Sequence, residues 1–233
     1  MKVRIKFSKK GPVRYIGHLD VMRYFQKAMR RSEIDIAYTT GFSPHQIMTF
    51  AAPLGVGLES NGEYMDVVLN SMDSSQEVVD KLNAVSCEGI KVISAKVLPE
   101  NAGNAMATVA AAKYTVLFRE GRAPKLDFKK VIEEFLTQKH ILVSKETKKN
   151  TLEVDLKPGI YELIAIDDGF SMTVDASSSG NIKPSMVVET LAEYAGISLV
   201  KNAFTVTREE TYLNAGTVDA PRFEPLDYIG TEI

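Results

Sequence analysis

Two hydrophobic periods alternate along this chain, and their order recurs. Residues 2–9 place apolar side chains at every second position, which is the period of a half-buried strand. Residues 18–31 instead repeat them at about 100° per residue, the period of an amphipathic helix. Later segments predict a helix at 74–85 and strands at 34–38, 47–51, 63–70 and 89–99. The first hundred residues therefore predict the element order β-α-β-β-α-β, with the three short strand-like segments between the helices not yet resolved into the two strands of that order.

The second half of the chain repeats this order at similar length. It predicts helices at 125–139 and 183–196, and strands at 113–120, 141–146, 151–157, 161–168, 170–176 and 202–210. We therefore expect an α+β fold of two tandem ferredoxin-like (β-α-β-β-α-β) units with antiparallel sheets. The predicted divisions are a first domain at 1–98, a linker at 99–111, a second domain at 112–211 and a C-terminal tail at 212–233.

Composition excludes several classes of enzyme. Cys87 is the only cysteine in 233 residues, so internal disulfides and multi-thiolate metal clusters are excluded. The HExxH, GxxxxGK[ST] and GxSxG motifs do not occur, and we expect neither a metal site nor a cofactor. No run of about 18 apolar residues is present, so we expect a cytoplasmic protein with no membrane partner.

Positive charge is concentrated at the start of the chain. The formal net charge is −2, yet residues 1–31 carry ten basic side chains and one acidic one, a net charge of +9. The remaining residues carry 18 basic and 29 acidic groups, a net charge of −11. This asymmetry favours a surface that contacts an anion, with nucleic acid the first candidate and an acidic protein partner the second.

Four of these cations share one face of the predicted helix at 18–31. Arg23, Lys27, Arg30 and Arg31 fall within about 100° of one another, opposite the apolar half. A charged face is usually only the solvated side of a helix. Solvated faces normally mix both signs, however, and here Asp20 is the one acid nearby, so a polyanionic ligand becomes the stronger interpretation.

The start of that helix carries a histidine and an aspartate. Gly17 and Asp20 are spaced as a helix cap and a first-turn carboxylate, and capping is the favoured role for Asp20. His18 in the first turn could act as a neutral hydrogen-bond acceptor or base, although a packing role is at least as well supported.

Aromatic residues are interleaved with these charges, a composition that suits single-stranded RNA. For any single aromatic residue, core packing or hydroxyl bonding is the safer assignment. The turn around Gly41 also concentrates groups that an exposed loop can present. The predicted ligand-binding residues are Arg14, Tyr15, His18, Arg23, Lys27, Arg30, Arg31, Tyr38, Phe42, Ser43 and His45.

Residues 14–69 also resemble a known bacterial family. The segments HLDVMR at 18–23, RR at 30–31, AYTTGFSPH at 37–45, APLG at 52–55 and EYMD at 63–66 are similar to the motifs of domain of unknown function 2344, also called the radical SAM-linked protein. Thr39 and Gly17 depart from that pattern, where the family more often has serine. The resemblance is strong over residues 2–70 and otherwise rests on general length and a TREETY segment at 207–212.

The resemblance implies a helper protein. Its members occur with radical SAM proteins that carry a B12-binding region, so such an enzyme is the expected partner. This chain lacks a three-cysteine cluster motif, and we therefore expect a non-catalytic accessory module that binds a substrate and presents it. That this substrate is RNA follows from the charge pattern and from the tandem ferredoxin-like fold, which is common among RNA-binding proteins. Two alternatives stay open: a metal-independent endoribonuclease with His18 or His45 as general base, and a protein-docking module that binds no nucleic acid.

Overall fold

The computed structural model describes residues 1–146 and 151–233, and the chain divides into two compact units. Unit 1 comprises residues 1–110 and 208–233, and unit 2 comprises residues 111–207. The strand β10 (Phe204–Asn214) begins in unit 2 and continues into unit 1.

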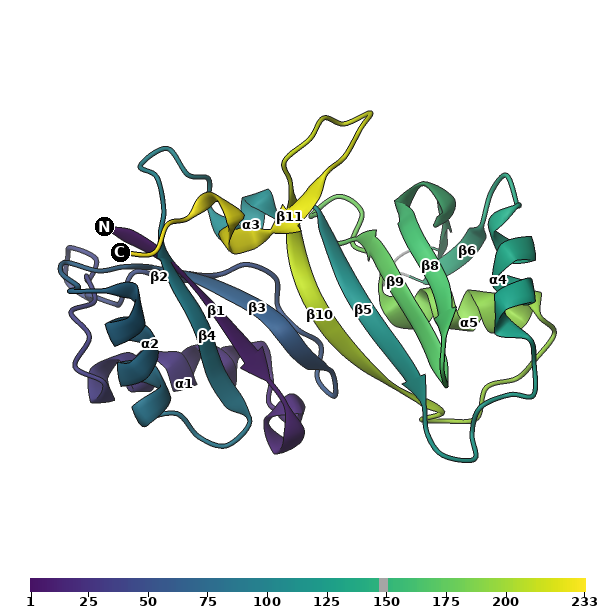
Figure 1. The fold of residues 1–233 in the computed structure, drawn as a ribbon, viewed down its shortest axis with the longest axis horizontal. Coiled ribbons are helices and arrows are strands. Elements are labelled where there is room, and N and C mark those ends of the chain that lie inside the picture. The colour runs from purple at the N-terminus through teal and green to yellow at the C-terminus, as the bar shows by residue number, and fades with distance from the viewer. Residues whose placement is uncertain (147–150) are drawn as a thin grey trace. The chain divides into compact units, whose positions relative to one another are not determined.

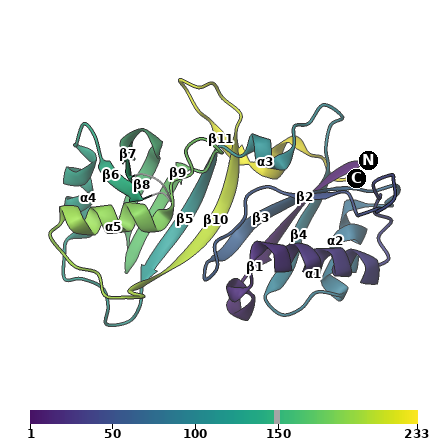
Figure 2. The same cartoon turned by 180° about the vertical axis from the view of Figure 1, so that it is seen from behind.

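Unit 1 is built on three antiparallel strands. The strand β1 (Lys2–Lys9) pairs on one side with β3 (Glu59–Val68) and on the other with β4 (Ile90–Val97), and β2 (Met48–Phe50) pairs with β3. The remaining elements are η1 (Gly11–Tyr15), α1 (His18–Arg31), α2 (Ser75–Ala84), α3 (Ala105–Thr108), β11 (Phe223–Pro225) and η3 (Leu226–Ile229). Figures 1 and 2 show these elements from opposite sides.

Helices α1 and α2 cover the same face of this sheet. One core contains the buried side chains of Phe25 and Met29 from α1 and of Leu82 from α2. Ile5 and Phe7, at alternate positions of β1, belong to the same core. The helical period at 18–31 thus predicted both the bounds of α1 and the face that it buries. The short strand-like segment at 34–38 contributes only isolated bridges, one of them between Ile36 and Leu69.

The opposite face of β1 is buried as well, although the alternating pattern predicted a half-buried strand. Arg4 is fully buried, and its Nη1 donates a hydrogen bond to the carbonyl oxygen of Leu226 in η3 at 2.7 Å. The backbone N–H of Ala105 in α3 donates to Asp66 on β3 at 3.0 Å. Segments that the sequence pattern left irregular therefore cover this face of the sheet.

Capping differs between the two helices of unit 1. Ser74 caps α2, because its side chain accepts a hydrogen bond from the N–H of Glu77 at 3.1 Å. Gly17 is the N-cap of α1 and can offer no side-chain bond. Asp20 lies in the first turn of α1, as predicted, where a carboxylate is favoured by the helix dipole. It contacts Nη1 of Arg23 at 3.4 Å, and it accepts no capping hydrogen bond from any residue that the structure describes.

Unit 2 contains antiparallel strands and a separate two-stranded hairpin. The strand β9 (Gly169–Asp175) pairs antiparallel with β5 (Ala111–Phe118) and with β8 (Ile160–Ile166), while β6 (Leu142–Glu146) pairs only with β7 (Thr151–Asp155). The helices are α4 (Phe128–Leu136), η2 (Lys157–Gly159) and α5 (Pro184–Tyr194). Pro184 opens α5, as its position in the sequence predicted.

The chain as a whole has a mixed α+β fold with one large sheet. Nine strands within residues 1–146 and 151–233 form it, in the order β4-β1-β3-β10-β5-β9-β8, with β2 beside β3 and β11 beside β10. The α+β class is confirmed. The strand pairing does not show two separate ferredoxin-like sheets, because all of these strands belong to a single pairing order that includes β10. No helix within the described ranges is both long and apolar enough to cross a membrane.

Candidate functional site

Much of the positive charge at the start of the chain is neutralised inside unit 1. Lys6 pairs with Glu210, and Nη1 of Arg14 lies 3.0 Å from Oε1 of Glu59. Arg4 pairs with Asp66 in the buried layer described above. The acidic partners come from β3 and β10, so the excess of +9 in residues 1–31 overstates the free charge at the surface.

The cations of α1 are the part of that excess that stays exposed. Lys27 and Arg30 are exposed and make no hydrogen bond or ion pair with any residue that the structure describes. Arg23 is 67% exposed and has only the 3.4 Å contact with Asp20, and Nη2 of Arg31 donates to the carbonyl oxygen of Val85 at 3.2 Å. Four donors thus lie along one side of α1, where they could contact successive phosphates of a nucleic acid.

An aromatic loop follows α1. Phe42 is completely exposed, and Tyr38 is about half exposed with its hydroxyl 3.4 Å from Nε2 of Gln46. Ser43 and His45 are exposed in the same loop, where Nδ1 of His45 lies 3.1 Å from Oγ1 of Thr39. Both views of unit 1 show α1 running toward the end at which this loop lies (Figures 1 and 2). The loop therefore offers aromatic surface beyond the last cations of α1.

Arg14 and Tyr15 lie at the other end of α1, in η1. Nη2 of Arg14 donates to the hydroxyl of Tyr15 at 3.0 Å, and the guanidinium lies over that ring with 4.9 Å between Cζ and the ring centroid. Since Arg14 also pairs with Glu59, its charge is compensated locally. Tyr15 is 61% exposed and remains available for contact.

The two histidines predicted as candidates have different neighbours. His18 lies on the buried side of α1, where its ring makes an edge-on contact with Phe50, with centroids 5.4 Å apart. His45 lies in the exposed loop, beside Thr39. No described hydrogen bond or ring contact joins the two histidines. The predicted ligand-binding residues therefore divide into the α1 cations, the loop around Phe42 and the end of α1 around His18.

A small pocket lies beneath His18. It has room for about one water molecule, and its walls are Phe7, Val21, Phe50 and the loop 52–54. Lys9 and Glu63 also line it, and Glu63 pairs with Arg208 through a 2.8 Å bond from Nε. None of these three charged residues was among the predicted ligand-binding residues.

A sequence signal existed for one of these residues. Lys9 falls at the odd-numbered positions of β1 whose other members are Val3, Ile5 and Phe7, whereas Glu63 follows the polar residues Ser60 and Asn61 and carries no such signal. Burial lowers the pKa of Lys9, and the nearby carboxylate of Glu63 opposes that effect. Charged residues at positions whose period predicts burial are candidates for a functional site.

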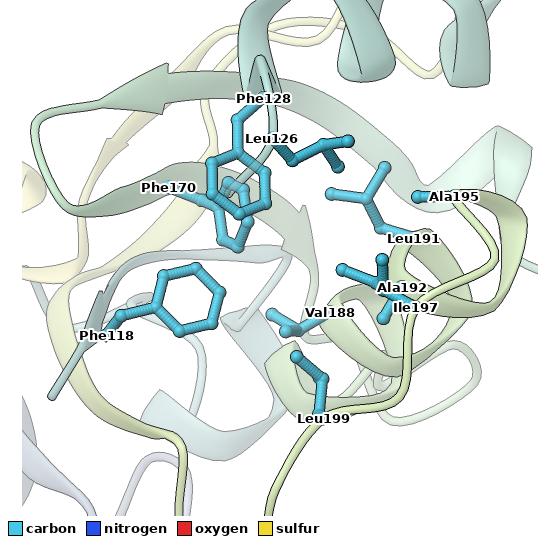
Figure 3. A pocket seen from close by; sticks show the side chains of 10 residues that line it. All are labelled: Phe118, Leu126, Phe128, Phe170, Val188, Leu191, Ala192, Ala195, Ile197 and Leu199. Atoms are coloured by element: carbon cyan, nitrogen blue, oxygen red, sulfur yellow. The ribbon is translucent and has the colours of Figure 1, made fainter. Parts of the chain in front are cut away.

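A second pocket, in unit 2, has no polar lining. It has room for about one water molecule and lies between α5 with the residues that follow it on one side and the sheet with the start of α4 on the other (Figure 3). Its walls are the rings of Phe118, Phe128 and Phe170 with aliphatic side chains such as Leu191 and Ile197. Without a hydrogen-bonding group it can offer only packing.

The described residues contain no group of three or more histidine, cysteine or acidic side chains placed to hold a metal ion. The site is thus made of cations, aromatic rings and one charged pocket, which suits binding of an anionic chain.

Comparison with known proteins places the chain in a family. A solved structure, the crystal structure of a Cbf5-Nop10-Gar1 complex, is similar over 90% of this chain and 48% of that chain, with 12% identity and a TM-score of 0.45. The chain thus spans about half the length of that structure's chain. No curated protein matches it. Residues 2–184 match the family described as an uncharacterized protein conserved in bacteria, and the chain belongs to this family, DUF2344.

Proposed function

We propose that this protein is an accessory protein that binds single-stranded RNA through the exposed side of α1 and has no catalysis of its own. The observation that carries the proposal is the exposure of Lys27 and Arg30 without an acidic partner among the described residues. Like charges at this helical spacing repel by a few tenths of a kcal/mol per pair. A polyanion removes that repulsion, and release of its counterions adds to the affinity.

The loop at 38–46 supports the choice of a single-stranded nucleic acid. A fully exposed ring such as that of Phe42 adds no stability to the folded protein, since an aromatic side chain stabilises a fold by being buried. Bases of single strands stack on such rings, whereas the bases of a duplex are covered by their neighbours.

Filter binding of a short RNA at several salt concentrations tests the proposal. We expect the affinity to fall steeply as salt rises, because each phosphate contact releases counterions. Reversal of Arg23, Lys27, Arg30 and Arg31 to glutamate should abolish binding. A salt response that is flat, or no binding at low salt, contradicts the proposal.

We further propose a radical SAM enzyme with a B12-binding region as the protein partner, on the basis of the family resemblance alone. Co-purification after nuclease treatment tests it, with the same four-residue reversal as the comparison. If the reversed variant still joins the enzyme but loses RNA, the RNA-binding role stands. If it loses the enzyme and RNA never bound, the face of α1 is a protein-docking surface.

The endoribonuclease alternative needs a base and a cation around one phosphodiester. No described hydrogen bond or ring contact joins His18 to His45, and we expect mixed RNA to stay intact when incubated with the protein and EDTA. Cleavage that is lost in His18→Ala would instead establish the enzyme.

We also propose that each unit is derived from a ferredoxin-like arrangement. The antiparallel order β4-β1-β3-β2 with both helices on one face supports this in unit 1, and the order β5-β9-β8 supports it in unit 2.

A further inference from the structure

The turn η1, which precedes α1, is anchored to the body of unit 1 from two sides. Nζ of Lys9 donates hydrogen bonds to the carbonyl oxygens of Ile16 at 2.9 Å and Arg14 at 3.4 Å. Oε1 of Glu59 accepts hydrogen bonds from the N–H of Gly11 and from Nη1 of Arg14, both at 3.0 Å. Lys9 is only 2% exposed, and a buried ammonium is costly unless hydrogen bonds compensate it. Its bonds to two carbonyl oxygens therefore hold η1 in place.

This anchoring fixes an aromatic ring at the surface. The guanidinium of Arg14 lies over the ring of Tyr15 and also donates to its hydroxyl. Tyr15 is nevertheless 61% exposed, so the guanidinium leaves much of the ring open to a ligand. Nucleobases stack on such rings, and a ring that is already held in place loses little conformational entropy when a base binds it.

A continuous row of side chains leads along α1 away from η1. It comprises Leu19, Arg23, Lys27 and Arg30. Residues three or four apart are neighbours on the surface of a helix, so this row is unbroken. Leu19, at its start, is 59% exposed and adds apolar surface beside the cations. In Figure 2, η1 and the loop at 38–46 lie at opposite ends of α1, so the row runs from one toward the other.

The length of α1 sets the length of RNA that can extend from one end of it to the other. The helix has 14 residues and is roughly 21 Å long at 1.5 Å per residue. A stacked strand rises roughly 3.4 Å per nucleotide, so about six nucleotides cover this length. Three stacked nucleotides cover only about 10 Å and cannot extend over both ends.

We propose that the RNA site of unit 1 is two-ended: a strand of at least about six nucleotides stacks one base on Tyr15 and another on Phe42, with the phosphates between them on the α1 cations. This inference rests on the proposed RNA-binding function. One strand that joins two stacking sites makes the second contact intramolecular, which raises the affinity beyond that of either contact alone. Such a site selects RNA by the length of its single-stranded segment and not by its sequence, since every base can stack.

Binding of a three-nucleotide and an eight-nucleotide RNA, measured by fluorescence anisotropy, tests the inference. We expect Tyr15→Ala and Phe42→Ala each to weaken binding of the longer RNA roughly fivefold or more, the effect of one lost stack. In the double variant the two factors should multiply, because the rings do not contact each other. Each single substitution should weaken the shorter RNA much less, because the remaining ring can still bind it. Tyr15→Phe should retain the affinity for both, since only the hydroxyl is lost.

Tyr228→Ala is the matched control. Tyr228 is 53% exposed in η3 of the same unit, and the guanidinium of Arg222 lies over its ring with 6.0 Å between Cζ and the ring centroid. The turn η3 covers the sheet face opposite α1, where Leu226 bonds to Arg4. This substitution should therefore leave the affinity for both RNAs unchanged.

The outcomes separate this inference from the proposed function. If Tyr15→Ala weakens the longer RNA no more than Tyr228→Ala does, or weakens both RNAs equally, the two-ended site is wrong while salt-dependent binding by the α1 face stands. If neither RNA binds at low salt, the proposed function fails and the inference fails with it. Melting temperatures check folding, and Tyr15→Leu, which keeps the apolar bulk without a ring, replaces Tyr15→Ala if that variant does not fold.

Discussion

Arg4 and Asp66 form a two-point ion pair inside unit 1. Nε of Arg4 lies 2.7 Å from Oδ1 of Asp66, and Nη2 lies 3.0 Å from Oδ2. Neither side chain is more than 3% exposed. The same two residues also bond to the backbone of Leu226 and Ala105, so this pair joins η3 and α3 to the sheet. A cation that the sequence places among surface charges thus has a structural role.

Removal of the carboxylate should destabilise unit 1. Asp66→Ala leaves Arg4 buried without its partner, and we expect a loss of about 3 kcal/mol in the free energy of unfolding. The double variant Arg4→Leu with Asp66→Leu should recover most of that loss, because both charges are then gone. Urea unfolding measures both values. A loss below about 1 kcal/mol in the single variant would mean that water reaches Arg4.

The exposed cations of α1 should act on RNA affinity and not on stability. Lys27→Glu and Arg30→Glu are each expected to lower the slope of log affinity against log salt by about 1, since each removes one phosphate contact. Lys91→Glu on β4 is the matched control, because Lys91 is exposed in the same unit but far from α1 in the chain. An equal effect of the control would indicate a response to net charge alone.

The helix α1 shows what sequence reasoning could reach. Its period gave the bounds 18–31 and separated the buried residues from the four cations, because an amphipathic helix has one dominant determinant, the apolar stripe. The fold class followed in the same way from alternating periods. What failed was the pairing of charges: the partners of Arg4, Lys6 and Arg14 lie 45 to 204 residues away, and no local pattern encodes such contacts.

The sequence pattern also did not predict that the strands join into one sheet. Periodicity gives each strand but not its neighbours, and β10 pairs in two units because it is eleven residues long and begins in one unit and ends in the other. The pocket beneath His18 was missed for a related reason. Lys9 was counted with the surface cations, although its odd-numbered position on β1 places it on the buried side.

Acid should remove a contact in unit 2. Nδ1 of His140 lies 2.8 Å from Oδ2 of Asp155, and this hydrogen bond, with one from the N–H of Ile141, lowers the pKa of Asp155. A carboxyl with a lowered folded pKa stabilises the fold above its unfolded pKa of about 3.9, and this contribution is lost as pH falls through the folded value. Both side chains are partly exposed, so the effect is small.

Melting temperatures of the wild type and Asp155→Asn between pH 7 and pH 2 measure that contribution. The difference between the two curves should begin to shrink as pH falls below about 4, the unfolded pKa, and vanish once pH is below the lowered pKa of the folded carboxyl. A difference that stays constant across this range would show that the variant acts through packing and not through titration.

The apolar pocket of unit 2 should not tolerate a larger side chain. Ala192 in α5 lines it, and Ala192→Met would push additional apolar atoms against the rings seen in Figure 3. We expect a loss of about 1–3 kcal/mol in the free energy of unfolding, because over-filling a packed core displaces its side chains. Ala84→Met on the exposed side of α2 is the control and should change stability by less than about 0.5 kcal/mol. An Ala192→Met variant as stable as the wild type would mean that the pocket can expand to take the thioether.

Phe42 should contribute to RNA affinity through stacking. Because the ring is completely exposed, Phe42→Ala removes no packing and should leave the melting temperature unchanged. Loss of one stacked base should weaken RNA binding by about 1–3 kcal/mol, or roughly 5- to 150-fold, while the salt slope stays the same because no phosphate contact is lost. Phe42→Trp should retain the affinity, since the larger ring also stacks. Fluorescence anisotropy at fixed salt measures these changes, and an affinity of Phe42→Ala equal to the wild type would remove the loop at 38–46 from the RNA-binding surface.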